Sequence, residues 1–387
     1  MNMVLLDRLR RNDKTYTELV FYENDFSRSD NFLELVTAIL MNTTVHTVRF
    51  HDCANPKWSP KQLKLLFATI ARLPCLRLLS IAQTRISIQF LTIILQKTKT
   101  LLELDVWGSE LVGTDYDVDD FAAALRAHSE LEAVYLKRVT FSENISSLDT
   151  LVKACRSTLD ILTMEQVEWP EGALSGQSLA YLATSSSSSS CESRSGLTQL
   201  TLEKLNLEEC HFQALATGLQ GCTSLRDLHL SRLTISDEAV AALAHSLKKN
   251  ESLKRLVINQ CQLSDRAAVE LANMLKVNTT LSHLELSENL IGDKGAINLA
   301  SALLMSSSIK RLQLYGNTNI QERGIQALVQ LAEQNYVLEA LELFAFSHNR
   351  STDEQVEIQK KINSFMDLND VGRTRRNSGK RPKVWYE

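Results

Sequence analysis

The sequence predicts an α/β solenoid in which parallel strands line a concave face and helices line a convex face. A pattern of leucines, LxxLxL followed by a turn residue, recurs every 28 residues from Leu197 onward. After each of these strand-like halves, apolar residues recur every three or four positions, as they do on one face of a helix. Because strands stack about 4.8 Å apart and packed helices about 10 Å apart, the stack is expected to curve into a horseshoe.

The repeat runs through nearly the whole chain. Its first leucine position falls at Tyr16, Val45, Leu76, Leu101, Leu131, Leu159, Leu197, Leu225, Leu253, Leu281, Ile309 and Leu338. The longest spacing, from Leu159 to Leu197, contains a run of serines that cannot pack into a core. We therefore expect a solenoid of about 12 repeats over residues 1–352, with a flexible Ser-rich insert at 184–196.

Polar residues mark the ends of the predicted helices. Ser236 with Asp237, and Ser264 one repeat later, suit the helix N-terminus, where a side-chain oxygen accepts from unpaired backbone N–H groups. Asn250 and Asn278 follow the helices and are expected to adopt the left-handed conformation of a helix end.

The C-terminal region departs from the repeat. Residues 353–370 predict an amphipathic helix whose Val356, Ile358, Ile362 and Phe365 cover the open end of the stack. Residues 371–387 form a flexible tail with six Lys or Arg residues against one Glu. Its basic residues Arg375, Arg376, Lys380, Arg381 and Lys383 suit either a nuclear-import patch or a plain solvated tail, and Ser378 is a phosphorylation candidate.

Composition places the chain in the intracellular class. Apolar residues make up 44% and charged residues 23% of the 387, and no apolar run approaches the length of a membrane span. The seven cysteines are scattered and odd in number, which disfavours a disulfide framework and a zinc module. We expect a cytoplasmic location, with a nuclear alternative through the basic tail.

These leucines and turn residues resemble those of the leucine-rich repeat family. In its 28-residue period and its helical outer side, the chain is similar to the ribonuclease-inhibitor-like subclass, which also forms the repeat regions of NLR-type receptors. The resemblance covers about Tyr16 to Phe346. The Asn/Cys turn position of the family is filled by Cys53, Cys261, Asn289 and Asn317, but holds Val139, Val167, Leu205 and Leu233 in other repeats.

The sequence contains no motif for catalysis. Phosphate-binding, metalloprotease, hydrolase and kinase signatures are all missing, so we expect a protein that is not an enzyme and needs no cofactor. The spacing of Asp115, Asp117 and Asp119 matches the first positions of a calcium-binding loop. The sixth position of such a loop, however, holds Asp120 in place of Gly, and the twelfth holds Arg126 in place of Glu. The aspartates are better explained as favourable charge at a helix N-terminus, and no metal site is predicted.

Binding is expected on the concave face, where the residues between the strand leucines point outward. Aromatic side chains are prominent there and are enriched at interfaces; an equally good explanation is that these rings cover irregular or terminal repeats. The predicted binding residues are Trp107, Tyr135, Asp105, Glu103, His229, Arg255, Glu285, Tyr315 and Phe344. The expected ligand is a protein; a small-molecule substrate is not expected, and nucleic acid is disfavoured because basic residues do not line the face.

Two functional hypotheses follow. The first is an intracellular interaction module that acts as a scaffold, sensor or inhibitor. The alternative is a GTPase-activating regulator of a Ran-like small GTPase, which uses the same repeat subclass. Members of that second family typically end in an acidic segment, whereas this chain ends in a basic one.

Overall fold

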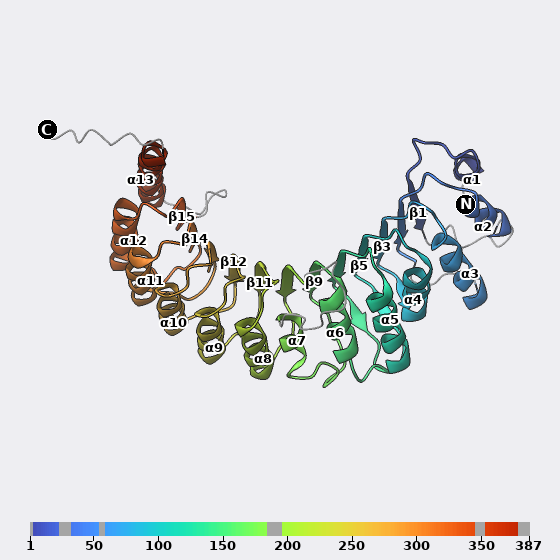
Figure 1. Ribbon diagram of the computed structural model, residues 1–387, viewed down its shortest axis with the longest axis horizontal. Helices are drawn as coiled ribbons and strands as arrows, with labels where there is room; N and C mark the ends of the chain where they lie inside the picture. Colours follow the sequence, from blue (N-terminus) through green and yellow to red (C-terminus); the bar gives the residue numbers. More distant parts are fainter. Residues whose placement is uncertain (1–2, 23–31, 54–58, 184–195, 345–352, 378–387) are drawn as a thin grey trace. The chain divides into compact units, whose positions relative to one another are not determined.

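The computed structural model describes residues 3–22, 32–53, 59–183, 196–344 and 353–377. The chain divides into two compact units: unit 1 comprises Met1–Leu182 with Ser186–Leu205, and unit 2 comprises Ala183–Ser185 with Asn206–Glu387. In each unit the chain alternates between strand and helix, and the strands lie in one layer and the helices in another (Figure 1).

Unit 1 contains a parallel sheet in the order β1-β2-β3-β5-β7-β9-β10. Its strands are β1 (Glu18–Tyr22), β2 (Thr47–His51), β3 (Leu78–Ala82), β5 (Glu103–Trp107), β7 (Ala133–Lys137), β9 (Ile161–Glu165) and β10 (Gln199–Glu203). Its helices are α1 (Met3–Arg10), α2 (Phe32–Leu40), α3 (Pro60–Ile70), α4 (Ile88–Lys97), α5 (Asp115–Ala127), α6 (Asp149–Thr158) and α7 (Ser178–Ala183).

Unit 2 contains parallel strands in the order β11-β12-β13-β14-β15. These strands are β11 (Asp227–Ser231), β12 (Arg255–Asn259), β13 (His283–Glu285), β14 (Arg311–Gln313) and β15 (Ala340–Glu342). The helices are α8 (Glu209–Gln220), α9 (Asp237–Leu247), α10 (Asp265–Leu275), α11 (Asp293–Met305), α12 (Glu322–Gln334) and α13 (Asp353–Asn377).

The predicted strand–helix repeat is confirmed. Each of these strands begins two residues after a predicted first leucine position, from Glu18 after Tyr16 to Ala340 after Leu338. The leucines of the pattern are buried between the strands and the helices, as Leu253, Leu256 and Leu284 illustrate. The helices contact their sequence neighbours along each unit, so every repeat buries its apolar face against the next one.

Unit 1 has two features that the leucine pattern does not predict. Short strands β4 (Arg85–Ser87), β6 (Glu110–Val112) and β8 (Thr140–Phe141) form a second parallel sheet in the turns between the main strands and the helices. Helix α1 precedes the first repeat, packs against α2 and buries Leu6 and Leu9. A helix in this place removes the apolar end of the first repeat from water.

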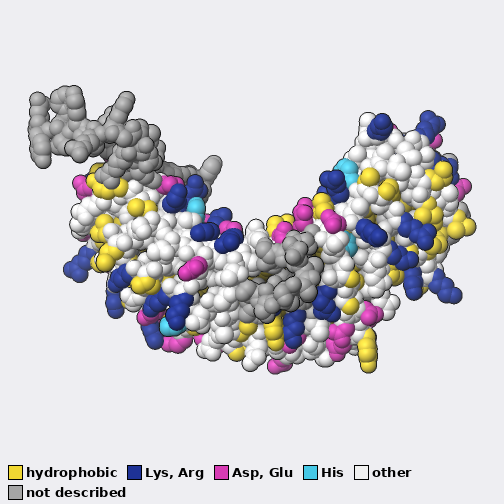
Figure 2. Space-filling view, in the orientation of Figure 1, with side chains coloured by type: hydrophobic (Ala, Val, Ile, Leu, Met, Phe, Trp, Pro, Cys, Tyr) yellow, Lys and Arg dark blue, Asp and Glu magenta, His cyan; other side chains and the backbone are white. Residues whose placement is uncertain are grey.

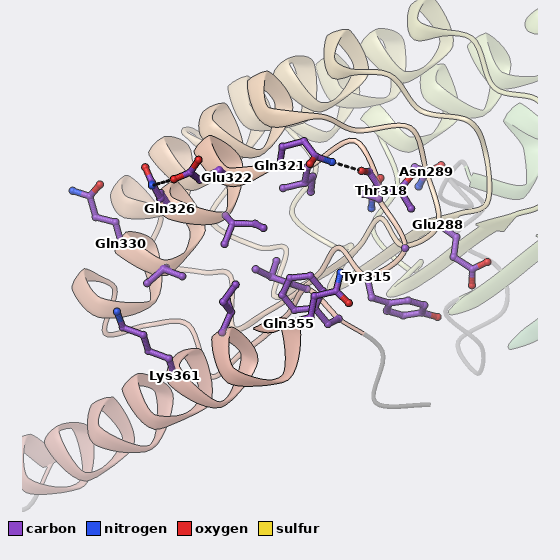
Figure 3. Close-up of a pocket in the computed structure, with 18 of the residues that line it drawn as sticks. Glu288, Asn289, Tyr315, Thr318, Gln321, Glu322, Gln326, Gln330, Gln355 and Lys361 are labelled. Carbon is purple, nitrogen blue, oxygen red and sulfur yellow. Dashed lines mark hydrogen bonds between the residues drawn. The ribbon is translucent and has the colours of Figure 1, made fainter. Parts of the chain in front are cut away.

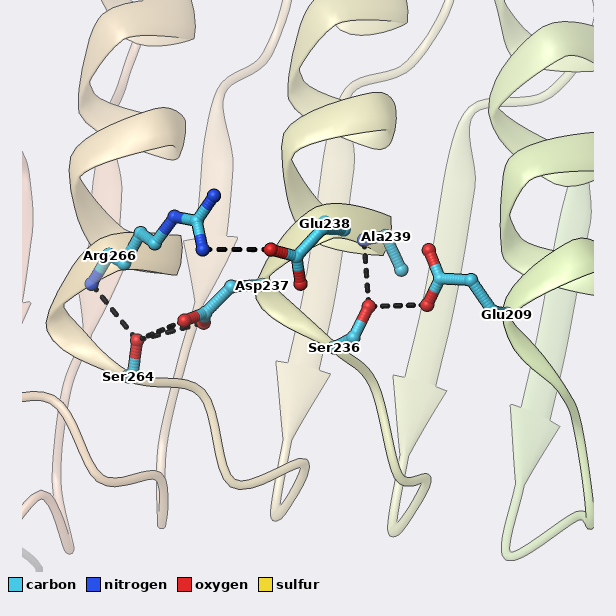
Figure 4. A network of polar contacts seen from close by, with 7 residues as sticks. All are labelled: Glu209, Ser236, Asp237, Glu238, Ala239, Ser264 and Arg266. Carbon is cyan, nitrogen blue, oxygen red and sulfur yellow. Dashed lines mark hydrogen bonds and ion pairs between the residues drawn. The ribbon is translucent and has the colours of Figure 1, made fainter.

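The helix N-termini are linked from one repeat to the next by acidic side chains. The N-cap hydroxyls of Ser236 and Ser264 accept from the N–H groups of Ala239 and Arg266, as predicted. Each hydroxyl also donates to a carboxylate of the preceding helix, Ser236 to Glu209 and Ser264 to Asp237 at 2.8 Å (Figure 4). Negative charge is thereby held at the positive end of successive helices.

The expected role of two asparagines is wrong. Asn250 and Asn278 are absent from the left-handed non-glycine residues of the described chain, and both side chains are buried. The Asn278 Nδ2 donates to the Leu247 carbonyl at 2.7 Å, and its Oδ1 accepts from the Leu281 N–H at 2.7 Å. The amide therefore satisfies the last carbonyl of one helix and the turn that leads into the next strand.

The left-handed conformation occurs instead directly after the strands. A residue with a positive φ follows ten of the twelve main strands in the described chain, and glycine fills the position only twice; Gln262 is a second such residue after β12. The residues are Asp52, Gln83, Gly108, Arg138, Gln166, Lys204, Arg232, Gln260, Glu288 and Gly316. The N–H of most of these residues donates to the last carbonyl of the neighbouring strand, for example Arg232 to Asn259 at 3.0 Å. This backbone bond offsets the cost of the unusual conformation.

Helix α13 follows the last strand and packs against α12 and β15. Ile362 and Met366 are buried, and the Gln359 amide bonds the end of β15, accepting from the Leu343 N–H at 2.9 Å and donating to the Leu341 carbonyl at 2.7 Å. The helix continues through Asn377, seven residues beyond the expected boundary at 370. Among the described residues, none of the helices combines the length and apolar content needed to cross a bilayer.

Candidate functional site

The outward-facing side chains of the strands form rows in register, and we call this surface the strand face. In unit 1 the middle row runs through Val20, Arg49, Ser80, Asp105, Tyr135, Thr163 and Thr201. In unit 2 the same row runs through His229, Val257, Glu285, Gln313 and Glu342. A parallel register aligns the same position of every repeat. The residues that lie between the strand leucines therefore form one row, as the sequence predicts.

Trp107 and Tyr135 lie on neighbouring strands of unit 1 but not directly opposite each other. Trp107 pairs with Lys137, and Tyr135 pairs with Asp105. A cationic side chain lies over each ring. The Lys137 Nζ lies 5.5 Å from the Tyr135 ring centroid, and the Arg138 Cζ lies 5.9 Å from the Trp107 ring centroid. At these distances a cation is attracted to the ring face. We call Trp107, Tyr135, Lys137 and Arg138 the aromatic cluster.

Carboxylates border the aromatic cluster on one side. Glu103 and Asp105 stand on β5, and the Asp105 carboxylate accepts from the Ser80 hydroxyl at 3.2 Å. Burial, together with the charges of Glu103 and Asp105, raises the pKa of the Tyr135 phenol above its usual value. The phenol is therefore a neutral donor at physiological pH, beside acceptors on one side and cations on the other.

In unit 2 an ion pair spans β12 and β13. The Arg255 guanidinium donates to the Glu285 Oε1 from Nε at 3.0 Å and from Nη2 at 2.5 Å. Val257 belongs to the outward row but is only 4% exposed, and it lies in register with Glu285 of this ion pair. Burial and the Arg255 charge lower the pKa of His229, which is held neutral at pH 7.

The starts of strands β11, β12 and β14 carry cations, of which the sequence analysis had singled out only Arg255. These basic residues occupy the first position of a strand or the position before it, whereas the middle row runs through the third position. They are Arg226, Lys254, Arg255, Lys310 and Arg311, and we call them the basic edge. The sequence signal is present in SLRDL, SLKRL and SIKRL, where one or two basic residues precede the strand leucine in three repeats.

A hollow of about 330 Å³ lies at the basic edge. Lys254, Arg255 and Arg311 line it together with Asp227, Ser282, His283, Glu285 and Gln313. Burial and the charges of Arg311 and Arg255 lower the pKa of His283. Three cationic side chains and two carboxylates, Asp227 and Glu285, thus line the hollow.

Tyr315 and Phe344 line a larger hollow of about 1280 Å³ at the end of unit 2, between α12, α13 and the turns after β13 and β14 (Figure 3). Burial and the carboxylates of Glu288, Glu285 and Glu342 raise the pKa of Tyr315. Glutamines and glutamates from α12 form one wall, and Gln355 and Lys361 of α13 form another. The two aromatic residues thus lie beside one hollow.

The three aspartates of the apparent calcium loop hold neighbouring repeats together. Asp115 accepts from the N–H groups of Ser146 and Ser147 at 2.7 and 3.1 Å, and hydrogen bonds with Ser146 lower the pKa of its carboxyl. Asp117 accepts from Gln89 at 2.8 Å and Asp119 from Thr150 at 2.7 Å. These bonds account for all three side chains, which lie on α5 as expected for a helix N-terminus.

Among the described residues, one group has the donors of a metal site: Glu208, Cys210 and His211 at the start of α8. The His211 Nδ1, however, accepts from the Glu208 N–H at 3.1 Å, within a capping box. A metal at this nitrogen would have to displace that bond. That this chain holds no metal site stays a prediction.

Other candidate residues lie outside the described residues. They are Ser378, Lys380, Arg381 and Lys383 of the tail, and Cys191 and the serines of the insert. In the described part of the chain, Cys75 and Cys210 are exposed, while Cys53, Cys155, Cys222 and Cys261 are buried. The Cys53 and Cys261 thiols lie near turn carbonyls, 3.4 Å from His51 O and 3.2 Å from Asn259 O, as expected for the turn position of the repeat.

Comparison with known proteins agrees with this geometry. Residues 221–244 and 277–300 match the family described as Leucine Rich repeat. These two segments match leucine-rich repeats, and the alternation of parallel strand and helix that contains them recurs in both units. No curated protein matches it.

Two solved leucine-rich repeat structures are similar to parts of the chain. One is described as leiomodin-1 actin-binding site 2, with 22% identity and a TM-score of 0.33; the match covers 38% of this chain and 80% of that one. The other is the tropomodulin C-terminal domain of Caenorhabditis elegans, with 16% identity and a TM-score of 0.35; it covers 41% of this chain and 92% of that one.

Proposed function

We propose that the chain is a non-enzymatic protein-interaction module whose strand face binds a protein partner. The observation that carries this proposal is the open strand face itself: helices pack on the other side of the strands, and the in-register rows hold aromatic, acidic and basic side chains (Figure 1). Repeats of this kind expose such rows as broad, rigid recognition surfaces. We also propose that its repeats are of the ribonuclease-inhibitor-like subclass and that it acts in the cytoplasm as a scaffold, sensor or inhibitor.

The aromatic cluster is the proposed anchor of this surface. Trp107 and Tyr135 are half-buried, so part of each ring is available to a partner while the rest packs against the protein. Trp, Tyr and Arg are the residues that most often dominate binding energy at interfaces. Glu103 and Asp105 supply acceptors at the border of the cluster, where charge complementarity selects among partners.

A partner-capture experiment tests the proposal. The Trp107→Ala/Tyr135→Ala variant is expected to recover a specific partner at least about tenfold less efficiently than the wild-type chain, because removing hot-spot rings costs about 2 kcal/mol or more. The matched control is Tyr116→Ala/Tyr336→Ala, which removes two exposed rings outside the strands. Equal recovery by both variants would count against the strand face.

A GTP hydrolysis assay separates the proposal from the GTPase-activating alternative. The module is expected to leave hydrolysis by a Ran-like GTPase unchanged at substoichiometric amounts. Stimulation that persists in the Trp107→Ala/Tyr135→Ala variant would favour the alternative.

A further inference from the structure

We propose that the hollow at the basic edge receives a carboxylate side chain from an acidic segment of the protein partner. This inference rests on the proposed function and adds the chemistry of the partner. It concerns unit 2 alone, and none of the residues in the aromatic cluster takes part.

Two cations at the hollow have no carboxylate partner within the described chain. Arg255 is paired with Glu285, and Lys310 with Glu339 at 3.1 Å. Arg226 donates to the Ser252 carbonyl at 2.9 Å. Lys254 and Arg311 are exposed, both line the hollow, and no ion pair joins either of them to a described carboxylate.

The spacing of the two cations suits one small anion. Lys254 precedes β12 and Arg311 begins β14, so one strand, β13, lies between them. Two strand spacings amount to about 10 Å, a gap that two long cationic side chains span from both sides. Ser282, which precedes β13, and His283, its first residue, also line the hollow and are hydrogen bonded to each other at 2.8 Å between Oγ and Nδ1.

The charges around the hollow favour a carboxylate over a phosphate chain. Asp227 and Glu285 also line the hollow, and Glu342 follows on β15. A continuous nucleic-acid backbone would bring several phosphates against these carboxylates, at a repulsive cost. A single Asp or Glu side chain brings only one negative charge to the hollow, where Lys254 and Arg311 can both bind it. Figure 2 shows Lys and Arg side chains gathered near the strands of unit 2.

Fluorescence anisotropy with a labelled hexaglutamate peptide tests the inference on the full chain. Wild-type protein is expected to bind the peptide, and Lys254→Glu/Arg311→Glu to bind about tenfold more weakly, since each exposed charge contact contributes up to about 1 kcal/mol and reversal adds repulsion. The matched control is Lys294→Glu/Arg323→Glu, which makes the same charge change at exposed positions of α11 and α12. Its affinity is expected to stay within about twofold of wild type, because a distant exposed charge acts weakly.

Three results would overturn the inference. They are equal losses in both double variants, no peptide binding by wild type, and equally tight binding of an oligothymidylate of matched charge that competes with the peptide. A different result would contradict the proposed function, namely that the Trp107→Ala/Tyr135→Ala variant captures a partner as well as the wild-type chain does. A partner that needs the aromatic cluster but is not displaced by hexaglutamate contradicts the carboxylate inference alone.

Discussion

The carboxylate of Asp265 holds the amino end of the following helix at Gly295. The Asp265 Oδ1 accepts from the Gly295 N–H at 2.8 Å and from the Gly292 N–H at 2.7 Å. One repeat later, Asp293 makes the same contacts with Gly324 at 2.8 Å and Gln321 at 2.7 Å. An acidic residue in one helix thus supplies the cap of the next one, so each repeat completes its neighbour.

Gly295→Ala is expected to destabilise unit 2 by about 2 kcal/mol, although alanine normally favours a helix over glycine by about 1 kcal/mol. A Cβ at this position would lie 2.7 Å from the Asp265 Oδ1, 2.7 Å from the Ile291 Cγ2 and 2.9 Å from the Ala268 Cβ. Urea unfolding followed by circular dichroism measures the change. Gly221→Ala is the control, because a Cβ there meets no atom within 4 Å. An unchanged unfolding midpoint for Gly295→Ala would show that the close packing is absent.

Asn278→Asp is expected to lower the free energy of unfolding by about 2 kcal/mol. The substitution keeps the acceptor for the N–H groups of Thr280 and Leu281. It removes the donor to the Leu247 carbonyl and buries a charge against that oxygen. Thermal unfolding gives the readout. Asn298→Asp, on the exposed side of α11, is the matched control, and a similar small effect at both positions would contradict the structural role of Asn278.

The repeat frame could be predicted from the sequence because the leucines recur at a fixed period and each one is buried by the same neighbours. All of the main strands start where the pattern puts them, and Ser236 and Ser264 cap their helices. The roles of Asp265 and Asn278 could not be predicted, since their partners lie in other repeats and are set by how repeats stack. Local propensity suggested a left-handed turn at Asn278, but its side-chain amide instead donates a hydrogen bond to the buried Leu247 carbonyl.

The candidate site was predicted only in part. The strand rows followed from alternation, so Trp107, Tyr135 and Asp105 were placed on the correct strands. The cations over the two rings were not predicted, because Arg138 lies in the left-handed position, where the direction of the side chain departs from strand alternation. Of the basic edge only Arg255 was predicted; Lys254 was missed because it precedes the strand and lies outside the rows considered.

Thiol labelling is expected to separate the described cysteines into two classes. Burial raises the pKa of Cys155 to about 12 and that of Cys261 to about 11, so neither forms a reactive thiolate at pH 8 in the folded chain. Iodoacetamide with peptide mapping should modify Cys75 and Cys210, which are exposed, within the time that leaves the buried thiols intact. Denaturant should abolish the difference. Rapid modification of Cys155 under native conditions would show that α6 opens readily.

The free energy of unfolding is expected to fall as the pH is lowered below about 6.5, the pKa of histidine in the unfolded chain. Burial is the main cause that lowers the pKa of His229 and His283 in the folded chain, and the charges of Arg255 and Arg311 add to it. Between the folded and unfolded pKa values the unfolded chain binds more protons, so acid favours unfolding. His229→Gln/His283→Gln should flatten this slope in urea unfolding at pH values from 7 to 5. His245→Gln, at an exposed position of α9, is the control, and equal slopes for wild type and the double variant would refute the assignment.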